Sequence, residues 1–346
     1  MKYGIILTSA LMFACSSEKE TVDTAVADEG CGVTVDETHP TSGAVDFYYR
    51  DSIEFELSDE DTTATLALQD ASGAEVAGTF TMDDDTLTFV PDAALSPSTS
   101  YTAVLNYCGD TEPVNVDFTT SSLGTALDGG DESLVGSTFA VDLGSGNFVE
   151  PPGVGDLIGG LLENQILIGI TDASDGQMSI RGAISVENSS EQDFCTETLN
   201  SFPAADFSGS PYFEIPEGDV QLSVAGLDIM INSMSISGTF ASDGSYMGGA
   251  SVRGELDARD IGPLLEGTLE STDPAEICTL LVGFGVQCIE CSSDSEPYCI
   301  SLYVNRLTAD NTNTTLGLVC DSDCHESCGD STCETPQAAD AQECIE

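Results

Sequence analysis

Short runs in which apolar and polar residues alternate recur along most of the chain. In the first third, the alternation predicts strands around Ile53/Phe55/Leu57, Leu66/Leu68, Val76/Phe80, Leu87/Phe89, Tyr101/Ala103/Leu105 and Val114/Val116/Phe118. Turn-forming stretches such as Asp70-Ala71-Ser72-Gly73 separate these runs, at the spacing of about eight to twelve residues that is typical of small all-β domains. The pattern predicts a β-sandwich over residues 31–120, built from about six or seven strands.

The alternation resumes after residues 121–133, a stretch rich in Gly, Ser and Asp that we interpret as a linker. Further strands are predicted around Phe139/Val141/Leu143, at residues 165–170 and 177–186, and along residues 219–256 with a hairpin turn at Ser242-Asp243-Gly244. Short helices are predicted at residues 153–162, at residues 261–269 and from Pro274, where Asp273 would be the N-cap and Ile277, Leu280, Leu281 and Phe284 would share one side.

The predicted fold class is therefore mainly β. A β-sandwich is followed by a larger antiparallel β-rich domain with two or three short helices, at residues 134–319. The remaining residues, 320–346, form a Cys-rich tail with too few apolar side chains to build a core, so covalent bridges would have to hold it.

The first residues have the pattern of a secretory signal. A positive charge at Lys2 precedes an apolar run that ends at Phe13 and Ala14, and this run is shorter than the roughly 20 residues needed to span a bilayer. Cys15 follows at once, and the segment resembles the lipobox of bacterial lipoproteins. That resemblance implies cleavage of a signal peptide at residues 1–14, a lipid on Cys15 that anchors the chain to a membrane, and a flexible tether at residues 15–30.

The alternative to lipidation is an ordinary cleaved signal peptide whose cleavage site lies further along the chain. In Gram-negative lipoproteins an Asp at the second position retains the protein in the inner membrane. Ser16 stands at that position, so the resemblance implies the outer membrane, with the protein facing the periplasm or exposed at the surface.

The first predicted domain resembles the bacterial Ig-like domains of S-layer and other surface proteins. The matching motifs are Pro40-x-x-Gly43, Phe55-x-x-Ser58, Leu87-x-Phe89-x-Pro91, residues 95–102 and Phe118-Thr119-Thr120. The resemblance implies an Ig-like β-sandwich that acts as a spacer or interaction module without catalytic activity. Cys31 and Cys108 depart from the family pattern, and we expect them to form a disulfide that joins the start of the domain to its next-to-last strand.

Acidic residues dominate the charge of the chain. Asp and Glu total 61 against 7 Lys and Arg, for a formal net charge of −54. Such a surface repels nucleic acid, which is therefore excluded as a partner. A solvated acidic coat is the preferred interpretation, and divalent-ion binding or a salty habitat is the alternative.

The cysteine count agrees with the lipobox. The chain has 13 cysteines; with Cys15 carrying lipid, an even number remains and can pair as disulfides in an oxidising compartment. These cysteines are Cys31, Cys108, Cys195, Cys278, Cys288, Cys291, Cys299, Cys320, Cys324, Cys328, Cys333 and Cys344. A zinc site at Cys288-x-x-Cys291, or at the tail cysteines with His325, is the less favoured alternative because zinc needs reduced thiolates.

No catalytic constellation is present in the sequence. There is no Gly-x-Ser-x-Gly elbow, phosphate loop or dinucleotide motif. The chain has two histidines, His39 and His325, and we interpret neither as a member of a catalytic triad. We therefore expect no enzyme, no cofactor and no metal site. The acidic run at residues 83–85 is interpreted as a solvated hairpin tip, with calcium binding as the alternative.

Two functional hypotheses remain. The first is a membrane-anchored lipoprotein outside the cytoplasm with a structural or interaction role, which presents its second domain to a protein or cell-surface partner. The second is a binding module for an apolar ligand enclosed by the β-rich domain. Residues 278–299 resemble the C-terminal region of uncharacterised lipoproteins from deltaproteobacteria, a resemblance that implies no activity.

Overall fold

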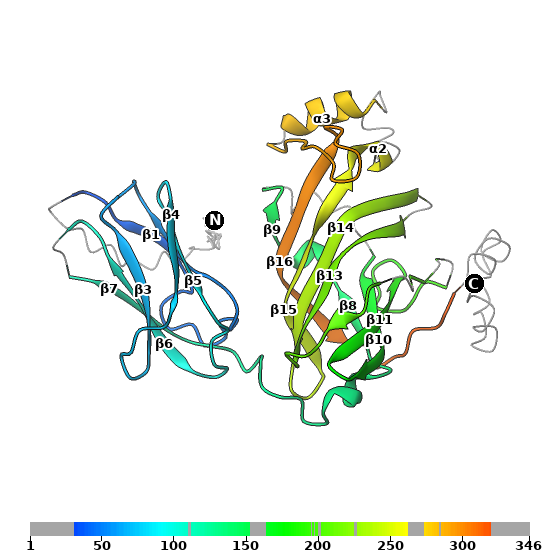
Figure 1. Ribbon diagram of the computed structural model, residues 1–346, viewed down its shortest axis with the longest axis horizontal. Helices are drawn as coiled ribbons and strands as arrows, with labels where there is room; N and C mark the ends of the chain where they lie inside the picture. Colours follow the sequence, from blue (N-terminus) through cyan, green and yellow to red (C-terminus); the bar gives the residue numbers. More distant parts are fainter. Residues whose placement is uncertain are drawn as a thin grey trace, which may run out of the picture.

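The structure is a computed structural model, and it describes residues 31–109, 112–152 and 164–319, apart from residues 195, 197, 200–201, 225–226, 262–272 and 284. The predicted lipobox and tether, the predicted helix at residues 153–162 and the Cys-rich tail all lie outside the described residues. Within the described part, the chain forms a small β-sandwich and a larger antiparallel β domain with disulfides, joined by one connection (Figure 1). The mainly β fold class is confirmed. None of the described helices is long and apolar enough to cross a membrane.

The β-sandwich consists of two sheets. One has the strand order β1-β2-β5-β4 and the other β3-β6-β7. The strands are β1 (Val35–His39), β2 (Ile53–Leu57), β3 (Thr65–Asp70), β4 (Gly78–Asp83), β5 (Thr86–Pro91), β6 (Ser100–Asn106) and β7 (Val114–Thr119). The predicted alternation decides which side chains face inward: Ile53, Phe55 and Leu57 are almost fully buried. They belong to one core cluster with side chains from the opposite sheet, including Leu68, Leu105 and Phe118.

Turn chemistry also follows the sequence. After β3, the Asp70 carboxylate accepts hydrogen bonds from the backbone of Ser72 and Ala74, and Gly73 takes the left-handed conformation with φ 81°. The sequence did not reveal β1, because its burial is irregular and a register shift interrupts its pairing with β2. His39 is the last residue of β1 and pairs with Asp51.

The second domain is one antiparallel sheet that closes on itself. Its order is β15-β14-β13-β12-β11-β10-β8-β16-β9, and β15 also pairs with β16. The strands are β8 (Thr138–Val141), β9 (Asn147–Glu150), β10 (Ile166–Ser174), β11 (Gln177–Ile184), β12 (Ala205–Asp206), β13 (Tyr212–Val224), β14 (Leu227–Phe240), β15 (Tyr246–Asp257) and β16 (Cys299–Asn311). Closure satisfies the backbone groups that an open edge would expose.

Side chains fill the inside of this closed sheet. Phe139, Phe207, Phe213 and Phe240 are all at most 1% exposed and pack with Ile236 and other aliphatic residues in one cluster. Over the described residues, the interior is therefore occupied by the domain's own side chains. This observation favours a packed core over a cavity for an apolar ligand.

The helices lie at one end of the second domain (Figure 1). The helix α3 (Pro274–Val282) begins where predicted: the Asp273 carboxylate accepts a hydrogen bond from the Ala275 amide. Its apolar side is narrower than predicted, because Ile277 is buried but Leu280 is exposed. A short helix, α2, spans Ala258–Ile261; the helix expected at residues 261–269 lies, apart from its first residue, outside the described residues.

The connection between the domains is more ordered than the composition of residues 121–133 indicated. Leu123 is buried in the core cluster of the β-sandwich and Leu127 in that of the second domain. The backbone amide of Asp128 also donates to the carbonyl of Ser242, and a 3-10 helix, η1 (Asp131–Leu134), follows. The two leucines anchor this short connection at both ends. Leu143, expected in a strand with Phe139, instead starts a second 3-10 helix, η2 (Leu143–Ser145).

Candidate functional site

Residues 47–51, which precede β2, form a loop of the β-sandwich that contacts the second domain. Phe47 is buried, and its ring packs edge-on against Phe118 with centroids 4.8 Å apart. The Tyr49 carbonyl accepts a hydrogen bond from the Leu95 amide. The body of the sandwich therefore holds this loop at two points.

Two tyrosines of this loop meet a buried threonine of the second domain. The Tyr48 hydroxyl lies 2.8 Å from the Thr239 hydroxyl oxygen, and the Tyr49 hydroxyl lies 3.3 Å from the same atom. Burial raises the pKa of Tyr48 above its ordinary value. The side chain is thus a neutral hydrogen-bonding group in this interface.

Gly249 makes this contact sterically feasible. It is a residue of β15 with φ 57°, and a Cβ atom there would lie 2.2 Å from the Tyr48 ring. Glycine supplies both the left-handed backbone and the space for the ring. Its neighbour Gly248 leaves similar space for the side chain of Leu123. A Cβ atom on Gly248 would lie 2.8 Å from that side chain.

A charged cluster extends the interface. The Arg306 Nε atom of β16 donates to the Asp51 carboxylate at 3.2 Å, and His39 Nε2 lies 2.9 Å from the same oxygen. Burial by itself would raise the pKa of Asp51, but the hydrogen bond with His39 and the positive charge of Arg306 outweigh burial and lower that pKa. Asp51 is therefore a carboxylate shared by the two domains.

Two further arginines lie over tyrosine rings. The guanidinium carbon of Arg50 is 3.7 Å from the centroid of Tyr212, and that of Arg253 is 3.6 Å from the centroid of Tyr303. Arg253 and Tyr303 are register partners on β15 and β16, so the sheet itself sets this stacking. Among the described residues, no carboxylate lies within ion-pair distance of either guanidinium.

A partly open cavity of about 210 Å³ lies between these groups. Figure 1 shows β15 and β16 on the side of the second domain that faces the β-sandwich. The residues that line the cavity are Tyr48, Arg50, Asp51, Tyr212, Ser237, Gly249, Ser251, Tyr303, Asn305 and Arg306. None of them carries an aliphatic side chain, so the cavity is lined by polar and aromatic groups.

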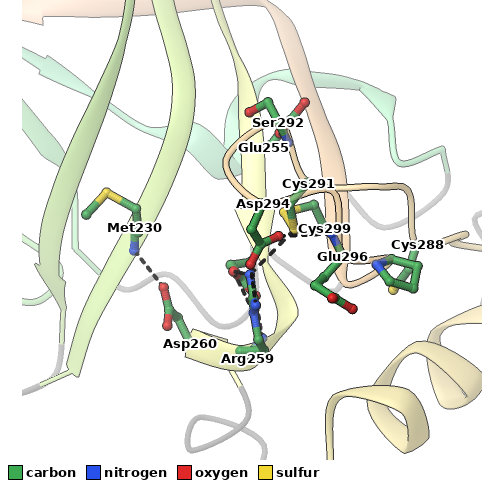
Figure 2. The surroundings of a disulfide bond; sticks show 12 residues. Met230, Glu255, Arg259, Asp260, Cys288, Cys291, Ser292, Asp294, Glu296 and Cys299 are labelled. Atoms are coloured by element: carbon green, nitrogen blue, oxygen red, sulfur yellow. Dashed lines mark hydrogen bonds and ion pairs between the residues drawn. A yellow bond between two sulfur atoms is a disulfide. The ribbon is translucent and has the colours of Figure 1, made fainter.

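A second polar cluster surrounds the disulfide between Cys291 and Cys299 (Figure 2). The Arg259 guanidinium hydrogen-bonds the buried carboxylate of Asp257 and also reaches the exposed Asp294 at 2.7 Å. The hydrogen bonds that Arg259 donates to Asp257 and Asp294 raise its pKa. The cluster fastens the loop between α3 and β16 to the end of β15, and we interpret it as structural.

The described cysteines form three disulfides: Cys31–Cys108, Cys278–Cys288 and Cys291–Cys299. Cys288 and Cys291 belong to different disulfides, so the alternative of a zinc site at Cys288-x-x-Cys291 is contradicted there. Two groups of metal-ligating residue types come together, around Asp61 and around Asp257, but both depend on cysteines already joined in disulfides. Cys15, Cys195 and the tail cysteines with His325 lie outside the described residues.

The acidic run at residues 83–85 lies at the tip of the β4–β5 hairpin, as expected. The structure brings none of the predicted site residues into the cavity. Its lining residues were missed because they come from separate domains. One usable signal was the scarcity of cations: the chain has five arginines, and one of them, Arg50, directly follows a pair of tyrosines.

Comparisons with known proteins identify the first domain. Residues 31–120 match the family model for the bacterial Ig-like domain. No curated protein matches the chain. This result confirms the Ig-like resemblance over these residues.

Solved structures show weaker similarity. CopC from Methylosinus trichosporium OB3b is 15% identical, with 25% of this chain and 91% of that chain covered and a TM-score of 0.22. L,D-transpeptidase 3 from Mycobacterium tuberculosis is 19% identical over 25% of this chain and 37% of that one, with a TM-score of 0.19. L,D-transpeptidase 1 from the same organism is 11% identical over 58% and 74%, with a TM-score of 0.21. We transfer no function from these proteins.

The bacterial Ig-like domain and the second, disulfide-containing β domain together give the chain the architecture of an extracytoplasmic binding or structural module.

Proposed function

We propose that the chain is a lipoprotein, anchored to the outer membrane through Cys15, in which the Ig-like domain holds the second domain in a fixed orientation for interaction with a partner outside the cytoplasm. The observation that carries the proposal is the interface between the domains. A simple spacer needs no such interface, since a flexible linker would suffice. Here a buried hydroxyl cluster at Thr239, the Asp51–Arg306 pair and Leu123 all restrain the second domain against the first.

The disulfides support a location of the protein outside the cytoplasm. Disulfides persist in oxidising compartments and are rare in the cytosol. Two of the described disulfides, Cys278–Cys288 and Cys291–Cys299, lie near the end of β16 at which α2 and α3 are found. They stabilise the end of the second domain that carries the helices.

The anchor is tested by substitution of Cys15. In cells fed an alkyne analogue of palmitate, we expect the protein to incorporate the label and to sediment with membranes. Cys15→Ala should abolish both, because the thiol is the atom that would carry the lipid. Ser16→Asp is the matched variant: it should keep the label but move the protein to the inner-membrane fraction. An unlabelled wild-type protein contradicts the anchor.

The fixed orientation is tested at Gly249. We expect Gly249→Ala to separate the domains, because the new Cβ would overlap the Tyr48 ring. Small-angle X-ray scattering should then show a larger maximum dimension and a broader distance distribution. Gly285→Ala is the control: Gly285 also has a positive φ of 84°, but nothing lies within 4 Å of its Cβ position. Both variants carry a backbone strain of about 1–2 kcal/mol, so identical scattering from the two would contradict the fixed orientation.

A further inference from the structure

The cavity between the domains has no role in the presentation function proposed above. Its walls offer hydroxyl, amide and guanidinium groups from the two domains, and its volume of about 210 Å³ corresponds to roughly seven water molecules. A small polar molecule fits such a space. An apolar ligand does not, because burial against unpaired polar groups is unfavourable.

Positive charge gathers at this one place in a strongly acidic chain. Arg50 and Arg306 line the cavity, and Arg253 stacks on the lining residue Tyr303. Three of the five arginines in the chain are thus found here, against 61 acidic residues overall. The concentration of scarce cations favours an anionic group as the ligand.

The acids near the cavity offset only part of this charge. Asp51 pairs with both Arg306 and His39, and Glu54 lies 4.0 Å from the Arg306 guanidinium, so the role of binding an anion falls to Arg50. Arg50 donates from Nε to the Tyr49 hydroxyl at 3.2 Å, and its guanidinium lies over the Tyr212 ring without a carboxylate partner among the described residues. A planar guanidinium held by stacking is oriented in advance for a carboxylate or phosphate, which it recognises in a bidentate manner.

The uncharged residues that line the cavity can hydrogen-bond hydroxyl groups of a ligand. Ser237 and Ser251 are register partners on β14 and β15, and their hydroxyl oxygens are 2.9 Å apart. Asn305 and the Tyr303 hydroxyl lie beside them on β16. Neutral donors and acceptors of this kind suit the hydroxyl groups of a sugar ring.

We infer that the cleft between the domains binds an acidic sugar unit, with its oxyanion on Arg50 and its hydroxyls on the serines of β14 and β15. The inference does not depend on the lipid anchor. It links recognition to domain docking, because each domain contributes part of the site. The negative charge of the whole chain opposes capture of an anion at long range, but charges beyond about 8 Å are largely screened at physiological ionic strength, where the arginine contacts decide binding.

Isothermal titration calorimetry on the purified protein at physiological ionic strength tests this inference. The probes are sodium glucuronate, glucose 6-phosphate, neutral glucose and inorganic phosphate. We expect glucuronate or glucose 6-phosphate to bind with a Kd of about 1 mM or below, and glucose and inorganic phosphate each to bind about tenfold more weakly or not at all. The better of the two acidic sugars identifies the oxyanion as a carboxylate or a phosphate.

Two variants locate the binding. Arg50→Gln should weaken binding about tenfold or more, because it removes a charged hydrogen-bond donor, whereas Arg181→Gln, which removes the same charge on β11 away from the cavity, should leave it unchanged. Scattering is recorded in parallel to verify that the domains stay docked. If Arg50→Gln separates them, Ser251→Val provides the second variant, since Ser251 is a lining residue of the second domain that hydrogen-bonds Ser237 and lies outside residues 47–51.

Several results would overturn the inference. Absence of binding for both acidic sugars is one, and equal binding of glucose removes the role of the arginines. Inorganic phosphate as strong as glucose 6-phosphate indicates a bare anion site with no sugar recognition. Binding that survives Ser251→Val, and also survives Arg50→Gln with the domains docked, places the ligand elsewhere.

Discussion

Phe240→Ala is expected to lower the free energy of unfolding of the second domain by about 3–5 kcal/mol, the usual cost of removing a fully buried phenylalanine. Phe240, the last residue of β14, is 0% exposed. Its ring lies 4.9 Å from Phe139 of β8, 5.1 Å from Phe213 of β13 and 6.0 Å from Phe207, between centroids. One side chain thus joins strands that are distant in sequence, and its removal leaves a cavity that surrounding rings cannot fill.

Chemical denaturation followed by far-ultraviolet circular dichroism measures this loss. The chain has no tryptophan, so backbone signal is the better probe. Val149→Ala is the matched control: Val149 lies in β9 of the same domain but is 39% exposed, and substitution there should change the free energy by less than about 0.5 kcal/mol. Equal transitions for the two variants would contradict the packed interior, and with it the preference for a core over an apolar cavity.

Most of the strands could be predicted because each has one buried and one open face. In β2, Ile53, Phe55 and Leu57 point inward while the residues between them face outward, and a period of two is readable from sequence alone. The hairpin between β14 and β15 was predicted for a similar local reason. Its turn depends on Asp243, which bonds the Ser245 amide, and on Gly244 with φ 68°.

The strand β16 was missed although it carries part of the same signal. Ile300, Leu302 and Val304 alternate with polar residues. Beyond Val304 the pairing with β15 shifts register, and Arg306 has φ 57°. A bulge of this kind changes the phase of the alternation. The same bulge re-aims Arg306 toward the β-sandwich, so the irregularity that hid the strand also helps to build the interface.

The cavity could not be predicted because its residues meet only after both domains have folded and docked. Tyr48 and Thr239 are 191 positions apart, and Asp51 and Arg306 are 255 apart. No local pattern joins such pairs. Glycines in β15 were a weak signal, since a glycine inside a strand often marks a close approach of another group, but they do not say which group approaches.

Removal of the Cys31–Cys108 disulfide by the double substitution Cys31→Ala and Cys108→Ala is expected to destabilise the Ig-like domain by about 4 kcal/mol. The two cysteines are separated by 77 positions, and a bridge that closes a longer loop restricts the unfolded chain more. The double variant leaves no free thiol that could form a wrong bridge. Thermal unfolding followed by circular dichroism under oxidising conditions measures the change.

The matched comparison is the short bridge in the second domain. Cys291 and Cys299 are separated by 8 positions, so Cys291→Ala with Cys299→Ala should cost about 2–3 kcal/mol by the same relation. The opposite ranking of the two double variants would show that loop closure is not the main contribution of these bridges.

The position of the long bridge gives the ranking a functional meaning. Cys31 is the first described residue, at the boundary with the predicted tether, and Cys108 follows β6. The pKa of Asp61 is lowered mainly by a hydrogen bond from the Thr63 side chain and next by one from the backbone amide of Cys108. A force transmitted through a membrane tether would enter the β-sandwich at this point, and the covalent bond passes it to the middle of the sheet β3-β6-β7. We therefore expect the double variant lacking Cys31 and Cys108, when anchored in cells, to be degraded faster than the variant lacking Cys291 and Cys299, because the domain next to the membrane would open first.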